Sequence, residues 1–317
     1  MDRLFLGVDG GQSSTTALIA DEAGRVLGGG RGGPCNHVQG PEGREKFARA
    51  IGGSVAEACA RAGLNPAGVR FAAACLGFSG GPADKEALLG EMLRAGRLLV
   101  TTDAFIALTG ATAGEPGIIT IAGTGSIAFG RNAAGKTGRA GGWGYIFGDQ
   151  GGAFDITRQA LRAALRFEEG WGPKTVLRER LLAATGARDA NDLLHRFYTT
   201  GYPRPKIAAY ARIVNECARG GDAVARGIFE KAAQELALLT RAVRTQLFAP
   251  REAAIVAFIG GVFRSELLLE RFRTLVELDE GNRVAAPVHG PAAGAVIEAL
   301  AAEGLRPPLR NLPEFEK

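Results

Sequence analysis

The chain has 317 residues, of which 46% are hydrophobic and 22% are charged, and its formal net charge is +5. This length is enough for two domains of ordinary size, and the composition is that of a folded globular protein. No apolar run reaches the roughly 18 residues that a membrane-spanning helix needs, and no long basic run favours nucleic acid as a partner. The first residues enter a strand without a basic, cleavable leader, so we expect a cytoplasmic protein.

The four cysteines are widely spaced, and none belongs to a C-x-x-C pair. With only three histidines, the chain carries no zinc signature. We therefore expect four reduced and mostly buried thiols, at Cys35, Cys59, Cys75 and Cys217.

The first predicted elements are two apolar strands, at residues 4–9 and 14–21, joined by the turn Gly10-Gly11-Gln12-Ser13. Such a turn is often only a tight hairpin. It is also a candidate phosphate loop, because glycine lets another group approach the backbone closely, although the lysine of a P-loop is absent. Asp9 ends the first strand, where a buried carboxylate needs a partner, and Mg²⁺ or its bound water would supply one.

Alternating strands and helices continue this first half. We expect a strand at 26–30, a helix at about 41–62, a strand at 71–77, a helix at about 82–95, a strand at 98–102 and a short helix to about 108. Asn36 lies in the loop after the third of these strands, where an asparagine is either a turn residue or a ligand contact.

Asp103 directly follows the strand at 98–102. One interpretation is that it caps the short helix that begins there. The other is a general base, because open α/β sheets place their ligands at the carboxyl ends of strands. An alcohol that attacks a phosphate must lose its proton, and one carboxylate can accept it.

A linker of small residues at 110–116 precedes a second copy of the strand–turn–strand pattern. Strands at 118–122 and 127–130 flank Gly123-Thr124-Gly125-Ser126, whose N–H groups and hydroxyls could form an anion-binding nest. The alternative is again a plain hairpin. Because the pattern restarts in the middle of the chain, we predict an α/β fold of two related halves.

Six glycines surround three aromatic residues and a carboxylate between Gly141 and Gly152. Gly142 and Trp143 stand near the start of this segment, and the tryptophan could pack against the apolar face of a ligand. Asp149 could either bind ligand hydroxyls or cap the helix that starts near residue 153.

Residues 153–248 are almost entirely helical in pattern, and one more strand follows at 255–260. Gly260-Gly261 ends that strand, and these glycines would let a flat ribose or base lie against the backbone, or would only form a close turn. A helix at about 292–302 precedes a proline-rich tail.

The order and spacing of these motifs resemble the actin-like ATPase and sugar-kinase superfamily. Within it, the chain is most similar to the N-acetylglucosamine kinase group of the BadF/BadG/BcrA/BcrD ATPase-like family. The motifs that carry the resemblance are the first glycine turn, Asn-His, Thr-Thr-Asp, Gly-Thr-Gly-Ser, Gly-Gly-Trp-Gly-x-x-x-Gly-Asp and Gly-Gly, and they extend over nearly the whole chain.

The resemblance implies two ribonuclease H-like domains with an active-site cleft between them, at residues 1–115 and 116–291. It implies that the final helix and tail, at about 292–317, pack back on the first domain, that the second domain carries a helical insertion, and that the protein forms a homodimer.

The resemblance also implies ATP-dependent phosphorylation of an amino sugar, most simply N-acetylglucosamine, at its 6-hydroxyl. Asp9 would hold Mg²⁺ through water, and Asp103 would accept the hydroxyl proton. The ATP-binding residues would be Gly10, Gly11, Gln12, Ser13, Gly123, Thr124, Gly125, Ser126, Gly260 and Gly261. The sugar-binding residues would be Asn36, Asp103, Thr124, Gly142, Trp143 and Asp149.

Alternatives remain open at this point. Gln12, Ser14 and Val38 stand where some relatives carry a glycine, a basic residue and a tryptophan. The first two departures bear on one phosphate contact, whereas Val38 leaves the choice between N-acetylglucosamine and glucosamine open. N-acetylmuramic acid is a further alternative acceptor. Two functions of other classes are an ATPase activator of a dehydratase or reductase, which would need paired cysteines for an iron–sulfur cluster, and a non-catalytic sugar sensor.

Overall fold

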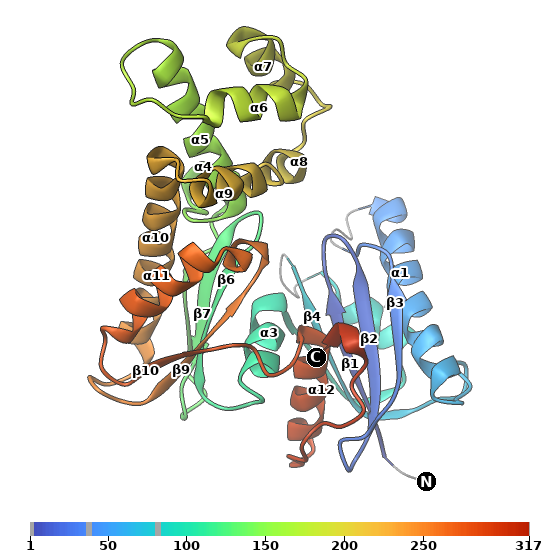
Figure 1. Cartoon of the computed structure of the whole chain (residues 1–317). Coiled ribbons are helices and arrows are strands. Elements are labelled where there is room, and N and C mark those ends of the chain that lie inside the picture. Colours follow the sequence, from blue (N-terminus) through green and yellow to red (C-terminus); the bar gives the residue numbers. More distant parts are fainter. Residues whose placement is uncertain (1–2, 36–39, 80–83, 317) are drawn as a thin grey trace. The chain divides into compact units, whose positions relative to one another are not determined.

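The computed structural model describes residues 3–35, 40–79 and 84–316 of the chain. The chain divides into two compact units, of which the first is discontinuous in sequence. Residues 1–117 and 286–317 form the first unit, and residues 118–285 form the second. Figure 1 shows both units, with the sequence running from blue to red.

A five-stranded sheet forms the centre of the first unit, in the order β3-β2-β1-β4-β5. β1 pairs antiparallel with β2 and parallel with β4, and β4 pairs parallel with β5. The elements of this unit are β1 (Leu4–Gly10), β2 (Thr15–Asp21), β3 (Val26–Gly32), α1 (Gly40–Arg61), β4 (Phe71–Phe78), α2 (Glu86–Met92), β5 (Ala95–Thr102), α3 (Asp103–Ala111), α12 (Pro291–Ala302) and the short helix η2 (Glu314–Glu316).

The continuous apolar run of β1 is explained by burial on both faces of the sheet. Side chains alternate between the faces of a strand. Leu6 and Val8 therefore join the hydrophobic core beneath α1, and Phe5 joins a second core formed by α3 and α12. A central strand covered on both sides reads as unbroken hydrophobic sequence.

The glycines of β3 have a packing role. A Cβ atom added at Gly28, Gly30 or Gly32 would collide with carbonyl oxygens of α1. The alternating glycines thus leave a flat strip on which the helix backbone rests directly against the strand. Figure 1 shows α1 lying along β3.

The second unit repeats the same sheet, in the order β10-β9-β6-β7-β8. The strands are β6 (Gly117–Ala122), β7 (Ser126–Arg131), β8 (Thr137–Gly141), β9 (Ala254–Ile259) and β10 (Asn282–Ala285). The helices are α4 (Gly144–Phe147), α5 (Ala153–Glu168), α6 (Leu177–Thr185), α7 (Ala190–Phe197), α8 (Arg204–Ala208), α9 (Ala211–Arg219), α10 (Ala223–Leu247), the short η1 (Gly261–Arg264) and α11 (Glu266–Glu277).

The two sheets match strand for strand in chain order. In each, the first strand of the unit lies in the centre, with the second and third strands on one side and the fourth and fifth on the other. The prediction of an α/β fold with two related halves is therefore confirmed. Both glycine-rich turns are hairpins, one between β1 and β2 and the other between β6 and β7.

Two local predictions were wrong. The helix expected to reach about residue 95 ends at Met92, because Leu93 is extended and the chain from Ala95 pairs with β4. β8 was not expected, because its sequence is rich in glycine, yet it pairs antiparallel with β7. In both cases sheet pairing outweighs the local sequence preference.

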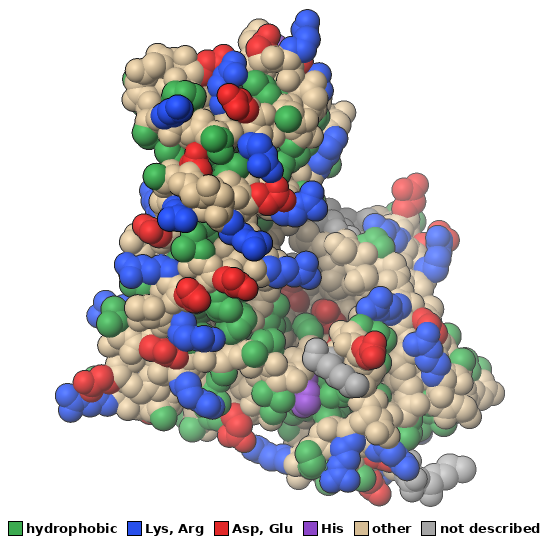
Figure 2. Space-filling model, in the orientation of Figure 1, with side chains coloured by type: hydrophobic (Ala, Val, Ile, Leu, Met, Phe, Trp, Pro, Cys, Tyr) green, Lys and Arg blue, Asp and Glu red, His purple; other side chains and the backbone are tan. Residues whose placement is uncertain are grey.

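Charged side chains of both signs are mixed over the face of the molecule that Figure 2 displays. No helix in the described part of the chain is both long enough and apolar enough to cross a bilayer.

Candidate active site

The first candidate group lies at the carboxyl ends of three neighbouring strands of the first unit. Asp9 pairs with Gly77 of β4, and Gly77 pairs with Thr101 of β5. The residues that end these strands or follow them therefore reach the same edge of the sheet. This register places Asp9, Ser79 and Asp103 in one group, on a strand order that the sequence alone did not reveal.

Asp103 is the first residue of α3, and the cap of that helix is Thr102, whose hydroxyl accepts a hydrogen bond from Phe105 N at 3.2 Å. The cap interpretation of Asp103 is therefore wrong. The Asp103 carboxylate accepts hydrogen bonds from Ser79 Oγ at 2.6 Å and from Ala104 N at 2.8 Å. These two donors fix its orientation, and sequence reasoning missed Ser79.

Asp9 is a partly buried carboxylate, and no hydrogen bond to its side chain is present among the described residues. Its pKa is raised to about 7, mainly by burial and further by the negative charges of Glu316 and Asp103. A cation beside Asp9 would stabilise the ionised form and so remove this cost.

This chemistry fits Mg²⁺, which proteins commonly hold through one or two carboxylates, water and substrate phosphates. The described residues contain no cluster of three or more His, Cys, Asp or Glu side chains able to hold a metal ion by themselves. Asp9 is therefore a candidate ligand for a metal–phosphate complex, in which water or phosphate would supply the other ligands.

Glu316 is a buried carboxylate that sequence reasoning did not single out. Its Oε2 accepts a hydrogen bond from Ala293 N at 3.0 Å, in the first turn of α12, and its backbone oxygen accepts one from Gly290 N at 3.0 Å. Only 4% of the residue is exposed. Burial raises the pKa of Glu316 to about 7, against the opposing effect of the α12 N–H groups.

The first hairpin turn is exposed at its tip. Gly11 N donates to Ser14 O at 2.9 Å, so this N–H is already used within the turn. The side chains of Gln12 and Ser13 are exposed, and Thr15 is buried with its hydroxyl donating to Gly33 O at 2.7 Å. Gln12 and Ser13 are thus the residues of this turn that remain accessible to a ligand.

The second hairpin turn is held by the start of α5. Ala153 N donates to Gly123 O at 2.8 Å, and Phe154 N donates to Thr124 O at 3.1 Å. Ser126 is buried, and its hydroxyl donates to Gln150 O at 2.6 Å. The Ser126 hydroxyl therefore supports the turn, while Gly123 and Thr124 face a cavity.

Asp149 lies directly beneath this second turn. Its carboxylate accepts a hydrogen bond from Ser126 N at 3.3 Å and forms an ion pair with Arg204 of α8. A Cβ atom at Gly125 would overlap the Asp149 carboxylate, so the turn can pack this closely only with glycine. The expectation that Asp149 caps α5 is wrong, because Gly152 occupies the cap position.

Gly142 and Trp143 lie next to the same turn, to which Gly142 is hydrogen-bonded. Gly142 N donates to Ser126 O at 3.0 Å, and the Trp143 side chain is exposed beneath the guanidinium of Arg139, 4.6 Å from the ring centroid. Asn36, the remaining predicted sugar contact, lies outside the described residues.

A cavity of about 470 Å³ brings the second turn together with the Gly-Gly sequence after β9. Gly123 and Thr124 line it on one side, and Gly261 lines it on the other. Gly260 has a φ of +114°, and a Cβ atom there would lie 2.5 Å from the carbonyl carbon of Ala122. Only glycine permits this conformation and this close approach of the two loops.

The same cavity has a polar wall formed by α9, the end of η1 and the N-cap residue of α11. Arg212, Asn215, Arg264 and Ser265 line this wall, and Ser265 Oγ donates to Asn215 Oδ1 at 2.7 Å. Cationic and hydroxyl groups beside a glycine turn suit a phosphorylated ligand.

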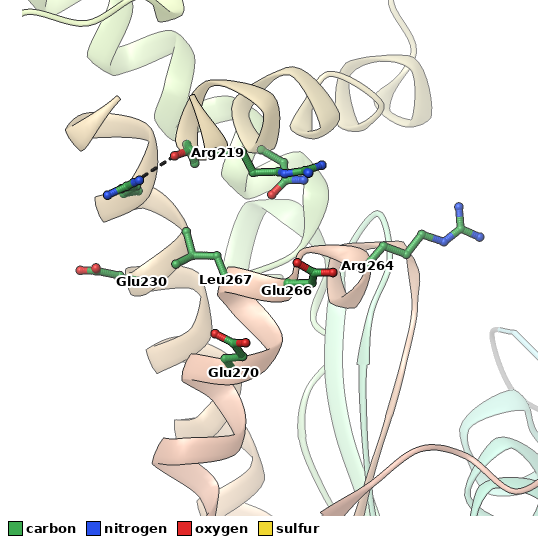
Figure 3. A pocket seen from close by; sticks show the side chains of 9 residues that line it. Arg219, Glu230, Arg264, Glu266, Leu267 and Glu270 are labelled. Carbon is green, nitrogen blue, oxygen red and sulfur yellow. Dashed lines mark hydrogen bonds between the residues drawn. The ribbon is translucent and has the colours of Figure 1, made fainter. Parts of the chain in front are cut away.

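A second cavity, of about 370 Å³, shares Asn215 and Arg264 with the first. Figure 3 shows Leu267 of α11 pointing toward α10, Glu266 and Glu270 on α11, and Arg264 extending away from them. Leu267 could pack against the face of a flat ring, and the surrounding carboxylates and guanidinium groups could hydrogen-bond to its polar edge. Together the two cavities could take a long ligand with a phosphorylated end and a flat end.

A family model described as the BadF/BadG/BcrA/BcrD ATPase family matches residues 6–302. An N-acetylmuramic acid/N-acetylglucosamine kinase from Clostridium acetobutylicum is 32% identical, over 94% of this chain and 98% of that protein. An N-acetyl-D-glucosamine kinase from Dictyostelium discoideum is 27% identical over the same shares of the two chains.

A solved structure from Chromobacterium violaceum, provisionally named an N-acetylglucosamine kinase, superposes with a TM-score of 0.74. It is 26% identical to this chain and covers 94% of it, and the match covers 99% of that structure. The resemblance inferred from the order of the motifs is thereby confirmed: the chain belongs to the BadF/BadG/BcrA/BcrD ATPase family.

Proposed function

We propose that this protein is an ATP-dependent kinase that phosphorylates the 6-hydroxyl of an amino sugar, most simply N-acetylglucosamine. The observation that carries the proposal is the single cavity lined by both Gly123-Thr124 and Gly261. Two glycine loops that line one cavity, in a member of an ATPase family, support ATP as the donor. The names of the similar proteins support an amino sugar as the acceptor.

In the proposed reaction, the sugar oxygen attacks the γ-phosphorus of ATP, and the bond from that phosphorus to the β-phosphate oxygen breaks. Asp103 accepts the hydroxyl proton, and the Ser79 hydrogen bond keeps its carboxylate oriented for this task. Positioning and electrostatic stabilisation supply most of the catalysis in such transfers.

The second unit would hold ATP, with its phosphates beside Gly123 and Thr124 and its adenosine beside Gly260, Gly261 and Arg264. The turn from Gly10 to Ser13 would contact phosphate oxygens through its exposed tip. Mg²⁺, when bound at Asp9, would offset the charge of the phosphates. We also propose that Asn36, Thr124, Gly142, Trp143 and Asp149 contact the sugar, that the protein works in the cytoplasm, and that it forms a homodimer.

The ATPase-activator alternative gains no support from the cysteines. All four are buried, and Cys217 is the sole cysteine in the second unit. A cluster shared between subunits would need accessible thiols placed close together. Purified protein that contains iron and absorbs visible light would revive this alternative.

A release assay for ADP across N-acetylglucosamine, glucosamine, N-acetylmuramic acid and glucose tests the proposal. We expect turnover with at least one amino sugar and a sugar 6-phosphate as the product. In Asp103→Asn, kcat should fall by about 10²- to 10⁴-fold, the usual loss on removing a general base, while ATP still binds. An active Asp103→Asn variant would exclude this residue as the base.

A further inference from the structure

Arg204 is placed to control the orientation of Asp149. It is the first residue of α8, and prolines on both sides restrict its backbone. Its guanidinium lies over two aromatic rings, 5.2 Å from the centroid of Tyr145 and 5.8 Å from that of Phe154. The side chain is thus held from three directions when it meets the carboxylate.

Asp149 itself is under constraint. It is a non-glycine residue with a φ of +64°, and it is only 6% exposed. A carboxylate buried to this degree is costly unless an opposite charge and hydrogen bonds compensate. Arg204 supplies the charge, and Ser126 N supplies a hydrogen bond. Without Arg204, the carboxylate would lose the partner that fixes one of its oxygens.

We propose that Arg204 is a positioning residue for the acceptor: through its ion pair it holds Asp149 so that the remaining lone pairs of the carboxylate face the sugar hydroxyls. An ionised carboxylate has about four acceptor positions, and the structure uses one on each oxygen. This inference rests on the proposed function, because it requires Asp149 to contact the sugar.

The guanidinium of Arg204 meets the Asp149 carboxylate through one terminal nitrogen only. Arg204 Nε is buried and has no hydrogen-bond partner among the described residues. The ion pair therefore uses one terminal nitrogen of the guanidinium and not two parallel N–H donors. The observed arrangement leaves part of the carboxylate free for another donor.

The chain offers a matched control in Arg158. This arginine also pairs with an aspartate through a terminal nitrogen, with Arg158 Nη2 2.7 Å from Asp155 Oδ1, and its Nε is also buried without a partner. Asp155 accepts a further hydrogen bond from Gln159 Nε2 at 2.8 Å and does not belong to the proposed sugar contacts. Arg158→Gln therefore removes a similar pair from a neighbouring arginine that lines the same cavity as Arg204 but pairs with another aspartate.

The test compares Arg204→Gln, Arg204→Lys and Arg158→Gln in the full-length protein, with acceptor KM, ATP KM and kcat measured separately. A hydrogen bond to a charged group corresponds to about a 10- to 100-fold change in affinity. We expect Arg204→Gln to raise the acceptor KM by this factor and to leave the ATP KM within about threefold. Arg204→Lys should recover part of the loss, and Arg158→Gln should leave the acceptor KM unchanged.

Two further measurements guard against simple unfolding. Arg204→Gln in an Asp149→Asn background should add no further loss of acceptor affinity, because the arginine acts through that carboxylate. Added guanidinium ion should partly restore Arg204→Ala, in which a space beneath Tyr145 opens.

An unchanged acceptor KM in Arg204→Gln, an equal effect on ATP, or an independent loss in the Asp149→Asn background would overturn the inference. Wild-type protein that phosphorylates no amino sugar would instead overturn the proposed function, and this inference with it.

Discussion

Replacing Glu316 with glutamine should stabilise the first unit at alkaline pH. Glu316 is buried against the first turn of α12, and its pKa lies near 7 in the folded protein, compared with an ordinary value of 4.5. The Glu316 carboxyl therefore binds its proton more tightly in the folded state than in the unfolded state, and between the two pKa values the folded state carries more of this proton. The contribution of Glu316 to stability is therefore most favourable below pH 4.5, declines as the pH rises toward 7, and is least favourable above pH 7.

The size of the effect follows from the two pKa values. The ionised carboxylate costs the folded state about 1 kcal/mol at pH 5 and about 3 kcal/mol at pH 8. Glutamine keeps an oxygen that can accept the Ala293 N–H bond but has no charge to bury. Glu316→Gln should therefore gain most of this energy at pH 8 and little at pH 5. The charge of Glu316 also raises the pKa of Asp9, so the variant should lower that pKa.

Hydrogen exchange of peptides from β1 and α12 is the suitable assay, because both tryptophans, Trp143 and Trp171, lie in the second unit. The measurements need protein free of Mg²⁺ and nucleotide, since either would act on Asp9. Glu314→Gln, at an exposed position in the same turn, controls for the change in net charge. Equal protection of wild type and Glu316→Gln at pH 8, or lower protection in the variant, would refute the reasoning.

Three other variants test the site. Ser79→Ala removes the 2.6 Å hydrogen bond to Asp103 and should lower kcat about tenfold without changing ATP affinity, as measured by ADP release; a normal kcat would show that Asp103 needs no such support. Gly260→Ala should weaken binding of a non-hydrolysable ATP analogue at least roughly tenfold by calorimetry, because of its φ of +114° and its contact with Ala122, and an unchanged affinity would exclude this turn from the nucleotide site. Asp9→Asn should require roughly tenfold more Mg²⁺ for half-maximal activity in a metal titration, and an unchanged requirement would exclude Asp9 as a ligand.

The sequence was sufficient to predict the repeated architecture. Each half carries its own strand–glycine turn–strand pattern, and apart from β8 and the start of β5, which depend on sheet pairing, the main strands and helices follow from the local sequence. The meeting of Gly123-Thr124 with Gly260-Gly261 was foreseen only through the family resemblance. Their separation of more than a hundred residues leaves no local signal of contact.

The residues that sequence reasoning missed share a physical reason. Ser79, Arg204 and Glu316 each act on a carboxylate that is far away in the chain. A serine after a strand, an arginine between prolines and a glutamate in a tail are all common on protein surfaces. Their roles arise from sheet register and helix packing, which a single sequence does not display.

The discontinuity of the first unit has a consequence for synthesis on the ribosome. β1 emerges well before α12, the helix that covers one of its faces. The contact is intimate, since a Cβ atom at Gly7 would lie 2.6 Å from Ala292 O. The second unit is continuous and can complete its core first. The face of β1 that α12 covers therefore lacks its native partner until residues 291–302 have been synthesised, and in this interval it is apolar surface that a chaperone could bind.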